Sequence, residues 1–355
     1  MRAVQYRAAM TGPAIAVFGA GAIGCWLGGR LAAGGADVTL IGRARVLDEL
    51  AAGLTVSELD GPTRTLGVAT ADAPGTTAGS PRVRTTTDPA AAAGAAITIV
   101  SVKSAQTAEA GQALARVLPA GALVVSMQNG VRNADLLRAA LPGRTVLAGM
   151  VPWNVVRSRP GVYHRGSSGT LRVERHPLGG PLYAALDRAG LAYQARTDMP
   201  AVQWGKLVMN LNNAINALAG IPLAAELAQR AFRRCLAAAQ REALELLDAA
   251  HLPIAKLTLV PPRWMPRMLE LPDRVFRLLA ARAVAIDPQA RSSMWDDLEA
   301  KRPTEIDQLQ GEVVALAQRL GRAAPVNAAL LGLVRAAEAG GKRDFTADEL
   351  VAQLR

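Results

Sequence analysis

Lysine is rare in this chain, and its rarity draws attention to the positions where it is kept. The sequence contains 40 lysines and arginines, of which only five are lysines: Lys103, Lys206, Lys256, Lys301 and Lys342. An amine can lose its proton at a usable pH, whereas a guanidinium cannot. A lysine kept in so arginine-rich a chain is therefore a candidate proton donor, although chance retention on the surface is our expectation for the last three.

Lys206 lies in a segment with more asparagines than helix propensity alone favours. At about 100° per residue, Asn210 lies roughly 40° to one side of Lys206 and Asn213 roughly 20° to the other, so all three share one face of a predicted helix. Buried amides need hydrogen-bond partners, which a substrate with carboxylate and hydroxyl groups would supply. An amide-rich contact between domains is the alternative.

Glu305 stands at the start of a further predicted helix. Pro303 and Thr304 form a helix-start signal, with Thr304 as the N-cap and Glu305 in the first turn. The helix dipole favours the charged carboxylate there. Glu305 would then accept a hydrogen bond from a substrate hydroxyl or an ammonium group, and simple capping of the helix is the alternative.

A glycine-rich loop near the N-terminus indicates a dinucleotide site. An apolar strand over Ala14–Phe18 leads into the loop, a helix follows over Trp26–Ala33, and a second strand covers Asp37–Ile41. The loop consists of Gly19, Ala20, Gly21, Ala22, Ile23 and Gly24. In this motif the first glycine permits the turn, the second admits a pyrophosphate, and the third lets the helix pack close to the strand.

The end of the second strand predicts which dinucleotide is bound. An NAD site places an acidic residue there to bind the ribose 2′-hydroxyl. This chain has Arg43 and Arg45 instead, and a guanidinium would pair with a 2′-phosphate. We therefore expect NADP(H), with a solvated loop as the alternative.

Two polar residues follow later strands of the same predicted sheet. Near-continuous apolar runs over Ile97–Val102, Ala122–Ser126 and Arg144–Ala148 favour a parallel sheet covered on both faces. Lys103 follows the first run and Asn129 follows the second. Because ligands bind at the carboxyl ends of such strands, Lys103 and Asn129 are candidate cofactor or substrate contacts, with solvated turns as the alternative.

Length and composition bound the fold class. With 355 residues, half of them apolar, the chain should fold as two domains. We expect an α/β protein: an N-terminal extension over 1–13, a doubly wound Rossmann-type domain over 14–196 and an all-helical domain over 197–355. The alanine-rich stretch 90–96 is expected to be helical.

Charge and cysteine content exclude several classes of protein. The net charge of +11 could attract nucleic acid, but only 4% of the residues are aromatic and the arginines are scattered, which argues against it. Two cysteines are too few for a disulfide framework or a thiolate metal cage, so we expect no metal and a cytoplasmic location. We expect neither a signal peptide nor a membrane span.

Taken together, these stretches resemble the ketopantoate reductase (2-dehydropantoate 2-reductase) family from Ile15 to about Pro325. By this resemblance, the glycine loop and Arg43 hold NADP(H), and Lys103 and Asn129 match two polar residues at the end of the sheet. Lys206 resembles the family's catalytic lysine, and Asn210 resembles its pantoate-binding asparagine. The family's serine and glutamate correspond to Ser293 and Glu305, and its active site lies in a cleft between the two domains.

The chain departs from the family pattern at three places. Ala214 stands where the family often has another asparagine, so we expect Asn213 to substitute for it. Extra length between His251 and Ser293 contains the proline-rich stretch 261–266, and Trp153 puts a bulky ring near the expected cleft. Both could reshape the substrate pocket.

The resulting hypothesis is reduction of a 2-oxo acid by NADPH, most simply ketopantoate to pantoate in pantothenate biosynthesis. Lys206 would donate the proton as the hydride arrives, and Glu305 would align the donor or the product hydroxyl. Asn129, Asn210 and Ser293 would orient the small-molecule substrate. The alternatives are a related reductase of another 2-oxo acid and a non-catalytic NADP(H) sensor; the resemblance also implies a homodimer.

Overall fold

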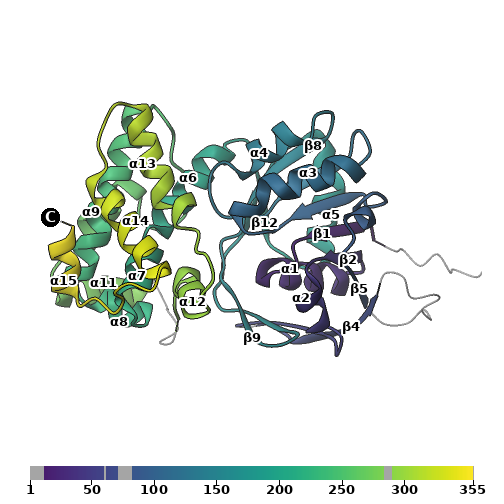
Figure 1. Ribbon diagram of the computed structural model, residues 1–355, viewed down its shortest axis with the longest axis horizontal. Helices are drawn as coiled ribbons and strands as arrows, with labels where there is room; N and C mark the ends of the chain where they lie inside the picture. The colour runs from purple at the N-terminus through teal and green to yellow at the C-terminus, as the bar shows by residue number, and fades with distance from the viewer. Residues whose placement is uncertain (1–11, 60, 71–81, 284–289, 355) are drawn as a thin grey trace, which may run out of the picture. The chain divides into compact units, whose positions relative to one another are not determined.

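A computed structural model describes residues 12–59, 61–70, 82–283 and 290–354, so most of the expected N-terminal extension lies outside it. The chain divides into two compact units. The first comprises Met1–Gln128 and Arg132–Thr197, and the second comprises Asn129–Val131 and Asp198–Arg355. Strands belong to the first unit, drawn in purple to teal, whereas the described part of the second is helical (Figure 1).

One sheet of twelve strands organises the first unit. Its strand order is β12-β11-β8-β7-β6-β1-β2-β5-β4-β3-β10-β9. The strands are β1 (Ala14–Phe18), β2 (Asp37–Ile41), β3 (Leu54–Glu58), β4 (Arg64–Thr70), β5 (Arg82–Thr86), β6 (Ile97–Val100), β7 (Leu123–Ser126), β8 (Thr145–Met150), β9 (Val155–Arg159), β10 (Val162–Arg165), β11 (Leu171–Glu174) and β12 (Tyr193–Arg196). The stretch from β8 to β4 is parallel throughout. The pairs β11–β8, β3–β4 and β9–β10 are antiparallel, whereas β11–β12 and β3–β10 are parallel.

Both faces of the strands from β8 to β2 are buried, as their apolar sequences require. Successive residues of a strand point to opposite faces. Ile15 and Val17 of β1 pack with Trp26 and Leu31 of α1 (Ala22–Ala33). Ala16 packs on the other face, in the cluster that includes residues of α3 (Thr107–Val117) and α4 (Asn133–Ala140). The remaining helices of this unit are α2 (Ala44–Asp48) and α5 (Gly180–Arg188).

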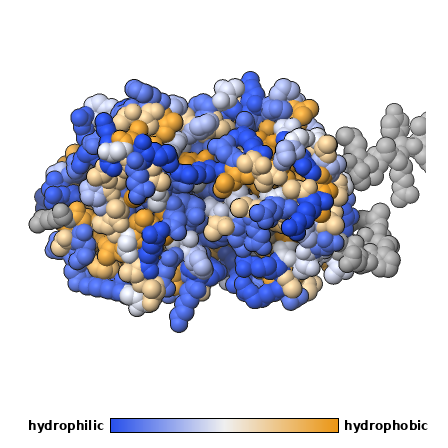
Figure 2. Space-filling view, turned by 45° about the horizontal axis from the view of Figure 1, so that its top comes forward, coloured by the Kyte–Doolittle hydropathy of each residue, from blue (hydrophilic) through white to orange (hydrophobic). Residues whose placement is uncertain are grey.

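The second unit is a bundle of helices around one apolar core. They are α6 (Met199–Asn210), α7 (Asn212–Ala219), α8 (Leu223–Ala228), α9 (Arg230–Ala249), α10 (Met265–Leu269), α11 (Asp273–Ala283), α12 (Ser293–Glu299), α13 (Gln310–Arg319), α14 (Pro325–Glu338) and α15 (Ala347–Gln353). The 20-residue α9 packs against α6, α7, α10, α13, α14 and α15. Polar residues are interspersed with small apolar groups over the face seen in Figure 2.

The fold class expected from the sequence is confirmed: an α/β Rossmann-type unit precedes a helical one. The sequence also predicts short extended runs over 161–164, 170–173 and 191–195, where β10, β11 and β12 form, but it does not predict β3, β4, β5 or β9. The stretch 90–96 is helical only in part, because it forms a 3-10 helix over Pro89–Ala92 that Asp88 caps by accepting from the Ala90 amide (2.9 Å). Within the described residues, no helix is both long and apolar enough to cross a membrane.

Candidate active site

The glycine loop makes a tight turn between β1 and α1. Gly19 has a φ of +116°, and its amide donates to the Ile41 carbonyl of β2 (2.9 Å). A Cβ on Gly24 would lie 2.0 Å from the Gly19 carbonyl oxygen. Gly24 thus lets α1 approach the residues that directly follow β1 and β6, and Gly28 makes the close approach to β2.

The start of α1 fits an anionic ligand. Gly21 is its N-cap and makes no side-chain cap, and the first turn contains no acidic residue. A Cβ on Gly21 would meet nothing within 4 Å. The backbone N–H groups of Ala22 and Ile23 stand in that first turn, where no intrahelical partner exists. This geometry suits the pyrophosphate of a dinucleotide. Ala20, in contrast, is buried.

The two arginines after β2 differ in their surroundings. Arg45 forms an ion pair with Glu49 (3.4 Å), one helical turn further along. Arg43, the N-cap residue of α2, is exposed and forms no ion pair among the residues that the structure describes. Arg43 is therefore the better placed of the two for a ligand phosphate.

A buried hydrogen-bond network shapes the carboxyl ends of β6 and β7. The Gln128 amide donates to the Val102 carbonyl (3.1 Å) and to the Thr107 hydroxyl (2.7 Å). Thr107 in turn donates to Asn133 (2.8 Å), whose amide donates to Ser104 (3.1 Å). These side chains fix the backbone on both sides of Lys103, which is itself exposed.

Lys206 differs from the other lysines in its surroundings. Lys103, Lys256, Lys301 and Lys342 are all exposed, whereas Lys206 is partly buried on α6. Burial lowers the pKa of Lys206 to about 8, because the ammonium form is poorly solvated there. An amine with this pKa can give up a proton near neutral pH.

The asparagines after Lys206 form two groups, one partly exposed and one buried. The helix is interrupted at Leu211, whose carbonyl accepts from the buried Gln310 side chain (2.8 Å); the Val208 carbonyl accepts from Gln240 (3.2 Å). Side chains of α9 and α13 thus bind two backbone carbonyls that a continuous helix would pair with its own amides. The sequence predicts one continuous helix here. Asn210 and Asn213 are partly exposed, at the end of α6 and the start of α7.

The remaining residues after the break face the interior of the helical unit. Asn212 and Asn216 are buried, and Ala214 is fully buried. A residue at position 214 therefore has no surface to offer a ligand, whereas Asn213 does. Asn216, which the sequence analysis did not single out, is hydrogen bonded inside the unit.

Glu305 and Asn129 meet although 176 residues separate them. The Asn129 side-chain amide donates to the Glu305 carboxylate (3.1 Å), and Glu305 is 8% exposed. The expected helix start is wrong in detail: Glu305 itself is the N-cap of a 3-10 helix and makes no side-chain cap. Thr304 accepts from the Ile306 amide instead (3.2 Å). The carboxylate of Glu305 is thus turned to a side-chain partner rather than to its own helix.

Ser293 is the first residue of α12 and is partly exposed. The cap of this helix is its neighbour Ser292, whose hydroxyl accepts from the Trp295 amide (3.1 Å). Trp153 does not match the expectation of a residue beside the site. It is 5% exposed and packs edge-on against Trp26 in the core of the first unit, with ring centroids 5.4 Å apart.

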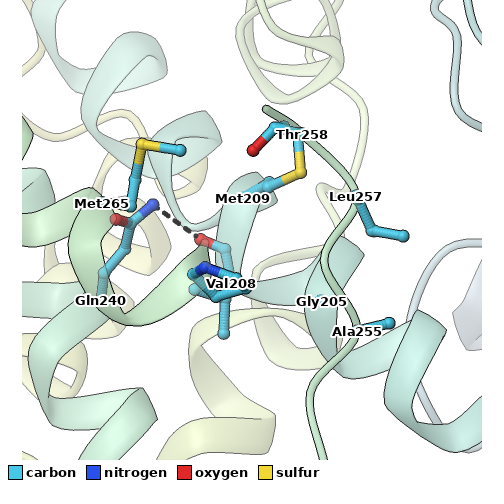
Figure 3. Close-up of a pocket in the computed structure, with 9 residues that line it drawn as sticks. Gly205, Val208, Met209, Gln240, Ala255, Leu257, Thr258 and Met265 are labelled. Carbon is cyan, nitrogen blue, oxygen red and sulfur yellow. Dashed lines mark hydrogen bonds between the residues drawn. The ribbon is translucent and has the colours of Figure 1, made fainter. Parts of the chain in front are cut away.

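Part of the extra length before Ser293 covers α6 next to Lys206; residues 284–289 lie outside the described ones. A cavity of about 20 Å³ lies between α6 and the segment 255–265. Figure 3 shows it, together with the hydrogen bond from Gln240 to the Val208 carbonyl. Its walls are formed by Gly205, Val208, Met209, Gln240, Ala255, Leu257, Thr258, Pro262 and Met265. That volume suits one water molecule, so this cavity is not a substrate pocket.

Comparisons with known proteins give a consistent result. The family model for ketopantoate reductase PanE/ApbA matches residues 15–177, and the model for its C-terminal part matches residues 198–338. The 2-dehydropantoate 2-reductase of Halobacterium salinarum is 30% identical over 338 residues, covering 92% of this chain and 99% of the relative. That of Pyrococcus horikoshii is 27% identical, covering 92% and 98%.

Solved structures show the same fold. A PanE/ApbA family ketopantoate reductase from Ralstonia eutropha JMP134 is 28% identical with a TM-score of 0.75, covering 92% of this chain and 98% of that one. A D-mandelate dehydrogenase in complex with NADH and anilino(oxo)acetate has a TM-score of 0.72 at 19% identity, which shows the fold alone. The chain therefore belongs to the ketopantoate reductase family and is an oxidoreductase of the 2-dehydropantoate 2-reductase type.

Proposed function

We propose that this protein reduces ketopantoate to pantoate with NADPH and that Lys206 is the general acid. The observation that carries the proposal is the partly buried Lys206 in the family's C-terminal region, whose pKa burial lowers to about 8. A donor is most effective when its pKa is close to the working pH. The four exposed lysines lack this burial.

The glycine loop and the start of α1 support a nicotinamide dinucleotide as the cofactor. The first-turn N–H groups of Ala22 and Ile23 would hold the pyrophosphate beside Gly21, where no side chain intrudes. Bound NADPH supplies the hydride that reduces the ketone carbon. Lys103, at the end of β6, would contact the cofactor from the loop that the Gln128 network holds.

In the helical unit, different residues would donate the proton, align the reacting groups and bind the substrate. Lys206 gives its proton to the ketone oxygen as negative charge develops there. Glu305, held by the Asn129 amide, keeps the substrate hydroxyl or the Lys206 ammonium in line. The partly exposed Asn210, Asn213 and Ser293 would bind the carboxylate and hydroxyl groups of the oxo acid.

Replacing Arg43 with alanine should change the cofactor preference. Loss of a guanidinium paired with the 2′-phosphate is expected to raise the KM for NADPH about tenfold or more and to leave the KM for NADH unchanged. Arg45→Ala is the matched control, because Arg45 pairs with Glu49 on the same helix. Initial rates with both cofactors measure this, and a wild-type preference of about tenfold for NADH would reject the phosphate role.

The substrate is tested with a panel of 2-oxo acids. NADPH oxidation is followed optically with ketopantoate and with analogues that lack its hydroxyl or its geminal methyl groups. We expect the highest kcat/KM with ketopantoate. A higher value for another 2-oxo acid would identify the chain as a related reductase, and NADPH binding without any turnover would identify a sensor.

A further inference from the structure

A buried carboxyl and two buried amides join α7 to α8 in the helical unit. Glu226 on α8 is fully buried, and its carboxyl accepts from the side chains of Asn216 (2.8 Å) and Asn212 (3.4 Å). Asn216 also donates to the Ile221 carbonyl (2.9 Å). Both N–H groups of Asn216 therefore have fixed acceptors, which determines where its side-chain oxygen points.

That oxygen holds the chain just before α12. The Asn216 side-chain oxygen accepts from the Ser292 amide (2.9 Å), while the Ser292 hydroxyl donates to the Asn213 carbonyl (3.2 Å). Two residues earlier, the Ala290 carbonyl accepts from the Leu223 amide of α8 (2.9 Å). Three hydrogen bonds thus hold the segment 290–292 against α7 and α8.

The helices α7, α8 and α12 lie together in the lower part of the helical unit in Figure 1. Ser292 caps α12, so its position sets where that helix starts. The next residue is Ser293. No charge is buried by this arrangement at neutral pH, because burial raises the pKa of Glu226 to about 8 and keeps the carboxyl protonated.

We infer that Glu226 and Asn216 are positioning residues for substrate binding: through Ser292 they set the place of the Ser293 hydroxyl on α12. The inference rests on the proposed function, which gives Ser293 to the oxo acid. A hydrogen bond to a carboxylate depends steeply on distance and angle, so a start of α12 that can shift costs substrate affinity. Neither Glu226 nor Asn216 itself needs to touch the substrate.

The first test replaces Asn216 with leucine, which fills a similar volume without hydrogen bonds. We expect the KM for the oxo acid to rise about tenfold, with kcat and the KM for NADPH changing less than about threefold. Glu226→Gln should keep wild-type values, because a glutamine oxygen can accept the same bonds as the neutral acid. Ser292→Ala removes one hydroxyl only and should also raise the KM for the oxo acid.

Asn327 offers a matched control. It is as fully buried as Asn216, and its amide likewise donates to a backbone carbonyl, of Ala239 (3.1 Å), and to a carboxylate, of Glu242 (2.8 Å). Asn327→Leu should lower the melting temperature as Asn216→Leu does but leave the KM for the oxo acid unchanged. An equal rise in KM in both variants would show a general loss of stability and overturn the inference.

A double-mutant cycle with Ser293→Ala tests the route of the effect. If Asn216 acts through Ser293, adding Asn216→Leu to Ser293→Ala raises the KM by less than about twofold. Full additivity overturns the inference. If Ser293→Ala alone leaves the KM unchanged, the role given to Ser293 under the proposed function fails, and the positioning role fails with it.

Hydrogen exchange tests the structural part without using activity. In the wild type and in Glu226→Gln, the peptide that covers Ser292 should be protected, and in Asn216→Leu its exchange should rise about tenfold or more. Unchanged exchange would overturn the inference even for a protein that reduces ketopantoate. Absence of any oxo-acid reduction, with the exchange result as expected, would instead place the failure in the proposed function.

Discussion

Lys206→Met is expected to lower kcat for oxo-acid reduction by about 100-fold or more, the usual loss when a general acid is removed. Methionine has a similar length but carries no proton to donate. NADPH should bind with unchanged affinity, since the glycine loop and Arg43 belong to the other unit. Steady-state rates and NADPH titration of the two proteins measure both quantities.

Stability distinguishes this loss from misfolding. The pKa of Lys206 in the folded state, about 8, lies below its ordinary value of 10.5, so folding disfavours the ammonium form. At pH 7 an apolar side chain should therefore be tolerated, and the melting temperature of Lys206→Met should not fall. Lys256→Met, at an exposed lysine of the same unit, is the control and should keep full turnover. Near-normal turnover in Lys206→Met would contradict this role and make Lys103 the next candidate for the proton donor.

The pH dependence should have opposite signs in the two directions of the reaction. Reduction needs the ammonium form of Lys206, which predominates below its pKa of about 8. The kcat/KM for reduction should therefore be constant below pH about 8 and then fall about tenfold per pH unit, or about 100-fold by pH 10. Oxidation of the hydroxy acid needs the neutral amine, so its rate should rise up to pH about 8 and level off.

Among the residues that the structure describes, Glu226 also has a pKa that burial raises to about 8, so its titration must be separated from that of Lys206. The Glu226→Gln variant removes that titration and should keep the same decline in reduction above pH 8. A profile that becomes flat in Glu226→Gln would assign the pH dependence to Glu226. A wild-type profile that stays constant to pH 10 would mean that Lys206 has the pKa of an ordinary exposed lysine.

Features that depend on local sequence could be predicted well. The run from β1 through the glycine loop to β2 was identified because its turn, helix start and apolar strands are encoded within about 30 consecutive residues. Lys206 was singled out because lysine is rare in the chain, and the structure finds it the partly buried one of the five. The helical nature of the second unit followed from its residue pattern in the same way.

Features that depend on distant partners could not be predicted. Strands β4 and β9 are largely exposed and lack the apolar pattern of the central strands, so only their pairing defines them. The hydrogen bond from Asn129 to Glu305 spans 176 residues. At the break in the helix, the Leu211 carbonyl accepts from the side chain of Gln310 in α13, a partner 99 residues further along the chain.

The central claim is that Lys206 protonates a 2-oxo acid as NADPH reduces it. Single-turnover oxidation of enzyme-bound NADPH by ketopantoate, in the wild type and in Lys206→Met, tests it most directly because product release does not contribute. We predict rapid oxidation in the wild type and a rate at least about 100-fold lower in the variant, with NADPH bound equally in both. Equal single-turnover rates, or a wild type that binds NADPH and does not oxidise it, would contradict the claim.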